Sequence, residues 1–161
     1  MVSVEQVIAD YGRALARIAA SYERDRALRD DLVQDIAVAV WRALPSLKDE
    51  AKLRPFVFRI AHNRAVSHVA RQAARPRQDE LSEALKDADP DPEQRLQDTE
   101  RSRRLVEAVR RLSLPYRQVI TLVLEDLSYE EIAEALGLTV NNVGVRINRA
   151  KAQLKAMLSD E

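Results

Sequence analysis

Hydrophobic residues in the first half of the chain recur three or four positions apart, which is the spacing of one face of an α-helix. This pattern predicts helices over 4–22, over about 27–44 and over about 54–74. Pro45 and Pro76 follow the second and third of these, and proline cannot continue a helix. The stretch IAVAVWRAL in the second helix is nearly all apolar and is expected to be deeply buried. The apolar face of the first helix comprises Val4, Val7, Ile8, Tyr11, Leu15, Ile18 and Tyr22.

The same spacing predicts further helices in the second half of the chain. They cover about 91–112, a segment that follows Pro115, residues 129–136 and residues 140–158. Asp91 is suited to cap the first of them, which has a proline in its first turn. No segment shows the sustained alternation of a β-strand, so the fold is expected to be all-α. The last helix carries a stripe that is expected to be buried, formed by Val143, Ile147, Ala150, Leu154 and Leu158.

The segment SYEEIAEALGLTV has the signature of a tight corner between two helices. Ser128 followed by Glu131 is a capping box. Gly137 stands where the first helix must end, because glycine adopts a left-handed conformation without strain from a Cβ atom. Thr139 is suited to cap the next helix. The caps, the corner and the apolar stripe together predict a helix-turn-helix, a motif whose second helix enters the major groove of DNA.

The polar side of that second helix carries residue types that can read bases. Asparagine pairs with adenine, arginine pairs with guanine, and valine contacts the methyl group of thymine. Residues 146–155 hold four basic and no acidic groups, which suits phosphate contacts. Alternatively, this side is the solvated face of a structural hairpin, and Gly144 either allows close approach of the backbone to DNA or is a tolerated change. The polar side comprises Asn141, Asn142, Gly144, Val145, Arg146, Asn148 and Arg149.

The third predicted helix is basic. Residues 51–78 hold seven Lys or Arg residues and no acidic residue. Four of its cationic or imidazole side chains are spaced 4, 3 and 4 apart, so a helix places them in one line. Arginine is also a good helix former on a wet surface, which is the alternative explanation. His62 lacks a second histidine at the spacing of a metal pair and is expected to be packed in the core. The line comprises Arg64, His68, Arg71 and Arg75.

Charge is unevenly distributed along the 161 residues, although the net charge is zero. Residues 1–78 hold 14 basic and 9 acidic residues, a net charge of +5. Residues 79–100 hold 2 basic and 9 acidic residues, a net charge of −7, and residues 101–161 hold 10 basic and 8 acidic, a net charge of +2. The chain therefore has two positive lobes with an acidic connector between them, an arrangement that indicates function as well as solubility.

The acidic connector predicts a division into domains. Residues 76–90 are polar and acidic with proline at both ends, so they are expected to form a flexible linker, with a brief helical turn over 81–86. We expect two small helical domains on either side, over 1–75 and 91–161.

Composition excludes several classes of protein and site. The chain has no cysteine, so thiolate metal sites, disulfides and cysteine nucleophiles are excluded. No apolar run reaches the roughly 18 residues that cross a bilayer. The start MVSVEQVIADYGR lacks the layout of a signal peptide, so the protein is expected in the cytoplasm. No paired buried carboxylates, Gly-rich phosphate loop or metal-ligand cluster is recognisable, and we expect no catalytic residues, no cofactor and no metal site.

Three stretches of the sequence resemble motifs of one protein family. No single stretch is unique to that family, but their order and spacing together are specific. They are DDLVQDIAVAVWRALPSLKDE, LRPFVFRIAHNRAVSHVARQAAR and LPYRQVITLVLEDLSYEEIAEALGLTVNNVGVRINRAKAQL. Together they resemble a bacterial extracytoplasmic-function (ECF) sigma factor, the smallest type of RNA polymerase specificity subunit, over nearly the whole chain. The first is similar to the helix that binds the polymerase clamp, the second to the helix that reads and melts the promoter −10 element, and the third to the domain that reads the −35 element.

The resemblance implies a three-helix sigma region 2 domain and a helix-turn-helix sigma region 4 domain, which bind core RNA polymerase and promoter DNA and help to open the strands. It also implies control by an anti-sigma factor. Polymerase binding is implied for Asp31, Gln34 and Asp35. Binding of −10 DNA, including capture of a flipped base by the loop 46–54, is implied for Lys48, Arg54, Arg59, Asn63, Arg64, Ser67, His68, Arg71 and Arg75. Binding of −35 DNA is implied for Thr139, Asn141, Asn142, Val145, Arg146, Arg149 and Lys151.

The chain departs from the family pattern at a few positions. The family often has an aromatic residue where Ala37 stands, a Trp at 56–57, an Asp where Ser67 stands, and a Lys-Ser pair at 144–145. Two other classes stay open: a helix-turn-helix regulator that binds DNA without polymerase, and a helical adaptor that keeps the fold without promoter function. The all-helical first half and its basic line favour the sigma factor over the regulator, and no site supports an enzyme such as a nuclease.

Overall fold

The computed structural model describes residues 1–75 and 99–159. The expected linker over 76–90, its helical turn and the expected helix start at Asp91 lie outside the described residues. Within the described ranges, all regular secondary structure is helical, which confirms the all-α expectation. Across the same ranges, no helix combines the length and apolarity that crossing a membrane requires.

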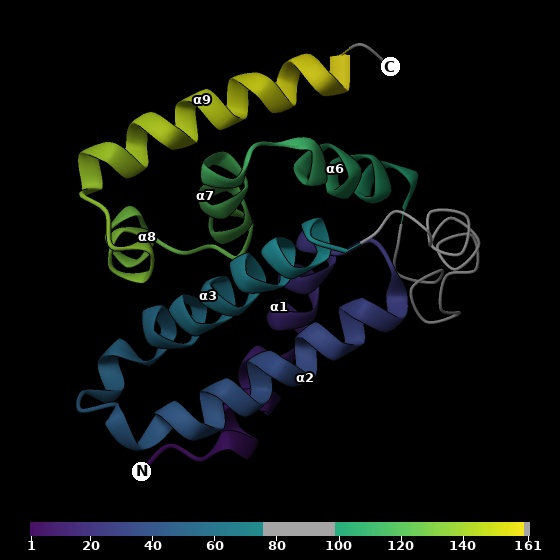
Figure 1. The fold of residues 1–161 in the computed structure, drawn as a ribbon. Coiled ribbons are helices and arrows are strands. Elements are labelled where there is room, and N and C mark those ends of the chain that lie inside the picture. The colour runs from purple at the N-terminus through teal and green to yellow at the C-terminus, as the bar shows by residue number, and fades with distance from the viewer. Residues whose placement is uncertain (76–98, 160–161) are drawn as a thin grey trace.

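The first half of the chain forms a three-helix unit, drawn in purple, blue and teal in Figure 1. Its helices are α1 (Val4–Tyr22), α2 (Arg26–Ala43) and α3 (Leu53–Ala73), and each contacts the other two. Two short 3-10 turns, η1 (Leu44–Ser46) and η2 (Glu50–Lys52), connect α2 to α3. The fully buried large side chains of this unit are aliphatic apart from one phenylalanine and one histidine: Val7, Leu15, Ile18, Leu32, Ile36, Val40, Phe58 and His62.

The second half is a helical unit in which a long last helix spans three shorter ones (Figure 1). The shorter helices are α6 (Glu100–Arg111), α7 (Leu114–Leu124) and α8 (Tyr129–Leu136). Helix α9 (Val140–Ser159) contacts all three. The largest fully buried side chains of this unit are Leu112, Leu122, Ile132 and Ile147.

Most helix boundaries agree with the hydrophobic pattern to within a residue. The helices predicted over 4–22 and 129–136 are observed with those bounds. The one predicted over 140–158 ends one residue later, and the one predicted over 91–112 is described from Glu100 and ends at Arg111. The agreement reflects local signals, since capping side chains at Ser3 and Ser128 fix helix starts independently of packing.

Three burial predictions are wrong in part. The stretch IAVAVWRAL of α2 is not deeply buried throughout, because Val38 is 43% exposed and Trp41 is 60% exposed. Only one stripe of α2 faces α1 and α3, and its buried residues lie four positions apart at 32, 36 and 40. Ile8, expected on the buried face of α1, is 43% exposed, and Leu158, expected in the stripe of α9, is 37% exposed near the helix end.

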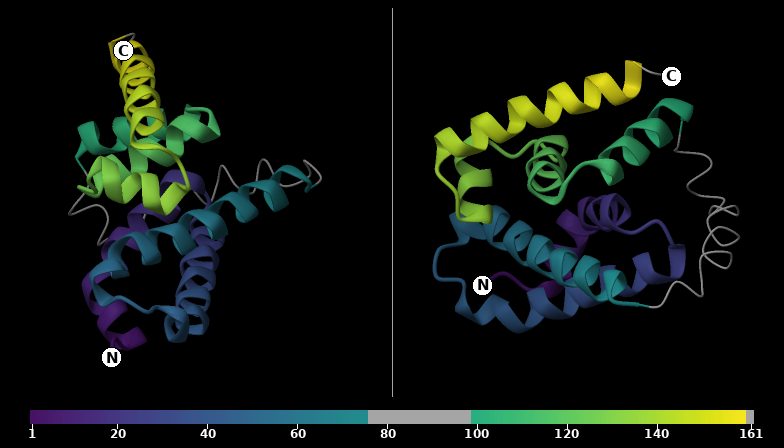
Figure 2. Two further views of the ribbon diagram at one scale, coloured as in Figure 1. Left: turned by 90° about the vertical axis from the view of Figure 1, so that its left-hand side faces the viewer. Right: turned by 45° about the horizontal axis from the view of Figure 1, so that its top comes forward.

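The two halves pack directly against each other. Figure 2 shows them stacked as two layers in both views, with α1, α2 and α3 in one layer and α6 to α9 in the other. The most extensive contact between the layers joins α3 to α8, and α1 contacts α6 and α7. These contacts of α3 with α8 and of α1 with α6 and α7 form the interdomain contact. The hydrophobic pattern of the sequence contained no sign of it.

Candidate nucleic-acid interface

The corner between α8 and α9 is built as the sequence predicts. The Ser128 hydroxyl accepts the N–H of Glu131 at 3.1 Å, and the Glu131 carboxylate accepts the N–H of Ser128 at 2.9 Å, a complete capping box. Gly137 has φ 69°, a left-handed conformation that ends α8. The Thr139 hydroxyl then accepts the N–H of Asn142 at 3.1 Å and caps α9. The helix-turn-helix is therefore confirmed in geometry.

The first turns of α9 present the predicted polar side to solvent. Arg146 is half-buried, and its Nε donates to the Oδ1 of Asn142 at 3.2 Å, which joins two of the side chains predicted to contact bases. The exposed face comprises Asn141, Asn142, Val145 and Arg149. Since successive residues turn by 100° around a helix, these side chains and Arg146 fall within one sector of α9. The arrangement offers hydrogen-bond donors, acceptors and an apolar group to a single groove.

Two residues of α9 are placed differently from this face. Lys151 is exposed, but at 100° per residue it lies roughly 150° around the helix from the centre of the face. Gly144 lies beside α8, where an added Cβ would be 3.6 Å from a ring carbon of Tyr129. That distance is an ordinary van der Waals contact, so neither a clash with α8 nor an unusual backbone angle requires glycine here.

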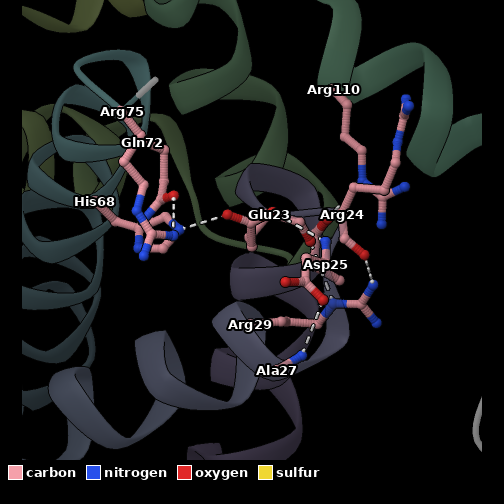
Figure 3. Close-up of polar contacts among 10 residues, drawn as sticks. Glu23, Arg24, Asp25, Ala27, Arg29, His68, Gln72, Arg75 and Arg110 are labelled. Carbon is pink, nitrogen blue, oxygen red and sulfur yellow. Dashed lines mark hydrogen bonds and ion pairs between the residues drawn. The ribbon is translucent and has the colours of Figure 1, made fainter. Parts of the chain in front are cut away.

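The basic line of α3 is divided in two by its contacts. Arg64 donates from Nε to the Oδ2 of Asp35 at 2.8 Å, so α2 engages it. His68 is only 4% exposed, and its Nε2 lies 2.7 Å from the Oε1 of Glu23, as Figure 3 shows. Arg71 and Arg75 are exposed. Of the four members of the predicted line, His68 is therefore buried, Arg64 is partly exposed beside Asp35, and Arg71 and Arg75 face solvent.

Glu23 is the centre of the polar cluster in Figure 3. Its second carboxylate oxygen accepts the N–H of Asp25 at 2.9 Å, and Asp25 in turn caps α2 by accepting the N–H of Ala27. Arg29 donates to the backbone carbonyls of Glu23 and Arg24 at 3.2 and 2.7 Å. His68 is thereby joined to the turn between α1 and α2, and its imidazole positions α3 rather than lying at the surface.

The other predicted −10 residues lie along a different line of α3 and in the turn before it. Ser67 is half-buried, and Lys48 is exposed in the connection between η1 and η2. Arg59 is exposed and Arg54 is half-buried, and both reach across the interdomain contact to the α7–α8 region. The outward side of α3 carries Arg59, Asn63, Arg71 and Arg75.

The three residues with an implied role in polymerase binding share one face of α2. Asp31 and Gln34 are exposed, and Asp35 is half-buried beside Arg64. The exposed Val38 and Trp41 continue the same face, because they follow Asp31 at helical spacings of seven and ten residues. Sequence reasoning missed these two residues by treating the apolar run as a core segment. A helical projection centred on Leu32, Ile36 and Val40 would have placed them outside.

His62 is packed in the core, as predicted. It lies 1% exposed between the halves, with Nδ1 3.0 Å from the Tyr22 hydroxyl and Nε2 3.3 Å from the Thr121 hydroxyl. Burial lowers the pKa of His62 from 6.5 to about 3, so its imidazole is neutral at neutral pH. Within the part of the chain that the structure describes, no three His, Asp or Glu side chains gather as a metal site would require.

Comparison with known families identifies both halves. The model for sigma-70 region 2 matches residues 7–75, and the model for sigma-70, region 4, matches residues 102–154. The first match covers most of α1 and all of α2 and α3, and the second covers most of α6 and extends through the helix-turn-helix into α9.

Relatives match over both regions. The chain is 32% identical to RNA polymerase sigma factor NccH of Alcaligenes xylosoxydans, over 95% of this chain and 85% of that protein. It is 33% identical to RNA polymerase sigma factor CnrH of Cupriavidus metallidurans over the same shares of the two chains. The ECF RNA polymerase sigma-E factor of Haemophilus influenzae is 32% identical, over 78% of this chain and 71% of that protein.

Solved structures agree with this assignment. CnrH in complex with the cytosolic domain of CnrY superposes with a TM-score of 0.70 and 30% identity, over 98% of this chain and 88% of that one. The sigma factor RpoE of Bartonella quintana, in complex with the anti-sigma factor NepR, superposes with a TM-score of 0.76 and 25% identity, over 96% of both chains. The matched regions, the relatives and the shared fold together show that this chain belongs to the extracytoplasmic-function (ECF) RNA polymerase sigma factors.

Proposed function

We propose that this chain binds core RNA polymerase through α2, reads the −35 element with α9, and reads and opens the −10 element with α3. The proposed division is a region 2 domain over 1–75, an acidic linker over 76–90 and a region 4 domain over 91–161. The observation that carries the proposal is the exposed reading face of α9 on a complete helix-turn-helix, combined in one chain with the exposed cationic side of α3.

For the −35 element we assign base reading to Asn141, Asn142, Val145, Arg146 and Arg149. Arg146 is the strongest candidate because the hydrogen bond to Asn142 fixes its side chain before DNA arrives. Thr139 acts through its cap, which sets the start of α9. Lys151, on another side of the helix, serves phosphate rather than a base.

For the −10 element we assign phosphate and base contacts to the outward side of α3 and its preceding turn: Lys48, Arg54, Arg59, Asn63, Ser67, Arg71 and Arg75. Arg64 and His68 contribute differently. Their partners Asp35 and Glu23 hold α3 against α2 and the end of α1, so we assign both residues to positioning the helix.

For polymerase binding we assign Asp31, Gln34 and Asp35, and we extend this face to Val38 and Trp41. An aromatic side chain with 60% exposure in a chain so poor in aromatics is a suitable anchor at a protein interface. An anti-sigma factor is a further proposed partner, since the RpoE structure that superposes on this chain contains one. The proposed location is the cytoplasm, and the chain is proposed to act as an initiation factor without catalytic chemistry of its own.

Transcription in vitro with purified core polymerase and a genomic promoter library tests the proposal. Arg146→Ala is expected to weaken −35 discrimination by about 1–3 kcal/mol, the value of one good base contact. Arg71→Ala is expected to slow promoter opening and to reduce the salt dependence of binding, because one phosphate contact is lost. Arg101→Ala and Arg13→Ala are matched controls, since each removes an exposed arginine from α6 or α1.

A gel shift without polymerase separates this function from that of a stand-alone regulator. Tight and sequence-specific binding of duplex DNA by the free chain, together with failure to associate with core polymerase, would contradict the proposal. Unchanged transcription by both Arg146→Ala and Arg71→Ala would leave the family assignment in place and would refute the site residues.

A further inference from the structure

The part of the interdomain contact between α3 and α8 lies near the N-terminus of α3. Lys52 Nζ lies 3.1 Å from the Oε2 of Glu134 in α8, and Arg54 Nε lies 3.8 Å from the Oε2 of Glu131 in the same helix. The guanidinium of Arg59 donates to the backbone carbonyl of Glu134. Lys52 at the end of η2 and the first two arginines of α3 are thus engaged by one helix of the region 4 half.

The turn between α7 and α8 adds a second set of contacts. Arg17 of α1 pairs with Glu125 through two hydrogen bonds, Nε to Oε2 at 2.8 Å and Nη2 to Oε1 at 2.7 Å. Arg54 donates from Nη2 to the backbone carbonyl of Glu125 at 2.6 Å. The side chain of Glu125 is only 9% exposed, and Arg17 pairs with both of its carboxylate oxygens.

We propose that the region 4 half is a built-in inhibitor of the −10 surface: in the closed form, α8 and the turn before it occupy cationic side chains of α3 that promoter DNA needs. Carboxylate and carbonyl oxygens of Glu125, Glu131 and Glu134 take the role of acceptor that phosphate oxygens of DNA would take. The N–H groups of Arg54 and Arg59 that α8 and the turn before it engage are not available to phosphate oxygens in the closed form, so closure and full −10 binding compete for the same donors. The inference rests on the proposed function, because it uses the −10 role of those two arginines.

The closed form blocks part of the −10 surface but leaves the proposed −35 and polymerase surfaces accessible. The reading face of α9 and the Asp31–Gln34 face of α2 are exposed in the closed form. Polymerase and −35 DNA can therefore bind before the halves separate. This order makes release of the start of α3 a step that follows recruitment, and it withholds Arg54 and Arg59 from DNA in the free protein.

The contact is suited to reversible opening. Several of its ion pairs are partly exposed, and an open hollow of about 460 Å³ lies beside them, lined by Tyr11, Arg17, Arg54 and Glu125 among others. Ion pairs in contact with water contribute little individually and weaken further with salt. DNA phosphates can therefore replace the carboxylates of Glu131 and Glu134 and the backbone carbonyls of Glu125 and Glu134 as partners of these cations. The superposition on RpoE covers 96% of both chains, so both halves contribute to it, in a structure that contains an anti-sigma factor.

Fluorescence energy transfer tests the closed form directly, because the chain has no native cysteine. Ala27→Cys and Ala156→Cys place labels on exposed positions of the two layers. We expect one high-transfer population in the free protein. The triple change Glu125→Gln, Glu131→Gln and Glu134→Gln should shift it to lower transfer and raise binding of single-stranded −10 DNA by up to about tenfold, since apparent affinity scales with the open fraction.

A matched control has the same change in net charge away from the interdomain contact. Glu5→Gln, Glu100→Gln and Glu130→Gln alter three exposed glutamates, and we expect no change in energy transfer. Glutamine at 131 can keep the capping box, and circular dichroism checks that both triple variants fold. A wild-type chain that shows low transfer, or a test variant that binds −10 DNA no better than the control, would overturn the proposal.

Crosslinking supplies a second test that does not depend on the triple variant. Arg17→Cys and Glu125→Cys, joined by a short reducible crosslinker, lock the halves together without changing a residue assigned to DNA or polymerase. The locked protein should bind core polymerase but support promoter opening at least about tenfold less well, and reductant should restore opening. Equal opening before and after reduction would refute the inhibition. If the reduced protein also fails to transcribe, the proposed function is wrong. The energy-transfer and single-stranded DNA binding measurements then still test the proposed inhibition.

Discussion

His62 of α3 and Thr121 of α7 share a hydrogen bond across the two halves of the chain, with Nε2 and Oγ1 3.3 Å apart in a buried setting. The Thr121 hydroxyl has one hydrogen, which it donates within α7 to the carbonyl of Arg117 or Gln118. We therefore assign the hydrogen of His62 to Nε2, and Nδ1 accepts from the Tyr22 hydroxyl. Burial raises the pKa of Tyr22, so this hydroxyl keeps its proton.

Acid is expected to destabilise the protein through His62. Its folded pKa of about 3 lies below its ordinary value of 6.5, so the unfolded state binds more protons between these values. Stability from this group is complete above pH 6.5 and falls by about 1.4 kcal/mol per pH unit as the pH drops toward 3. Between pH 7 and pH 5 the predicted loss in free energy of unfolding is about 2 kcal/mol, measured by urea titration.

His62→Gln isolates that effect from the titration of carboxylates. The variant lacks the titrating ring, so its loss of stability between pH 7 and pH 5 should be smaller than that of the wild type. Equal losses in both proteins would show that His62 does not govern the acid response. Absolute stability at pH 7 is not the readout, because the substitution also changes packing.

Glu23→Ala is expected to lower the free energy of unfolding by about 1–3 kcal/mol, the penalty for leaving buried polar groups without partners. The change removes the 2.7 Å contact with His68 and the acceptor of the Asp25 N–H. Glu5→Ala, at an exposed position of α1, should change stability by less than about 0.5 kcal/mol. A double-mutant cycle with His68→Ala should show coupling, and a His68→Ala protein of wild-type stability would contradict a positioning role.

Gly137→Ala is expected to destabilise the helix-turn-helix by about 1 kcal/mol, because φ 69° is strained for a residue with a Cβ atom. Gly12→Ala is the matched control. Gly12 lies within α1, where an added Cβ would meet Ile8 at an ordinary 3.7 Å, so the substitution should stabilise by about 0.5–1 kcal/mol. Shifts of the same sign in thermal unfolding of the two variants would refute the conformational argument.

Gly144→Ala is expected to raise the free energy of unfolding by up to about 1 kcal/mol, since the added methyl group fits beside Tyr129 and alanine favours the helix. Binding of −35 DNA distinguishes the two interpretations of this glycine. Unchanged affinity indicates a tolerated position, whereas a loss of affinity in a more stable protein indicates close approach of the backbone to DNA. A less stable variant would contradict the fit of the methyl group.

Local signals made much of the fold predictable. The capping residues Ser128 and Thr139 and the corner at Gly137 act within a few residues of themselves, so the helix-turn-helix could be drawn with its boundaries. The exposed side of α9 could be listed for the same reason, since its four buried residues recur at fixed helical spacing. The burial of His62 was also foreseen, from the absence of a second ligand at suitable spacing.

Burial and pairing at longer range could not be predicted in this way. Trp41 and Val38 belong to an apolar run, but their exposure depends on which side of α2 meets α1 and α3. His68 has the spacing of a surface line, and it is buried because Glu23, 45 positions away, approaches it from the end of α1. The chain's spacing fixes which residues share a face, whereas neighbouring helices determine which faces are covered.

The sequence by itself determined the helices, their caps, the helix-turn-helix and the family, because these depend on contacts between residues near in the chain or on motif order. The tertiary structure alone decided that the two halves meet, and that Arg54 and Arg59 are held by Glu125 and Glu134. Such contacts join residues more than 70 positions apart. Their geometry follows from the shapes of two packed surfaces, which no local spacing encodes.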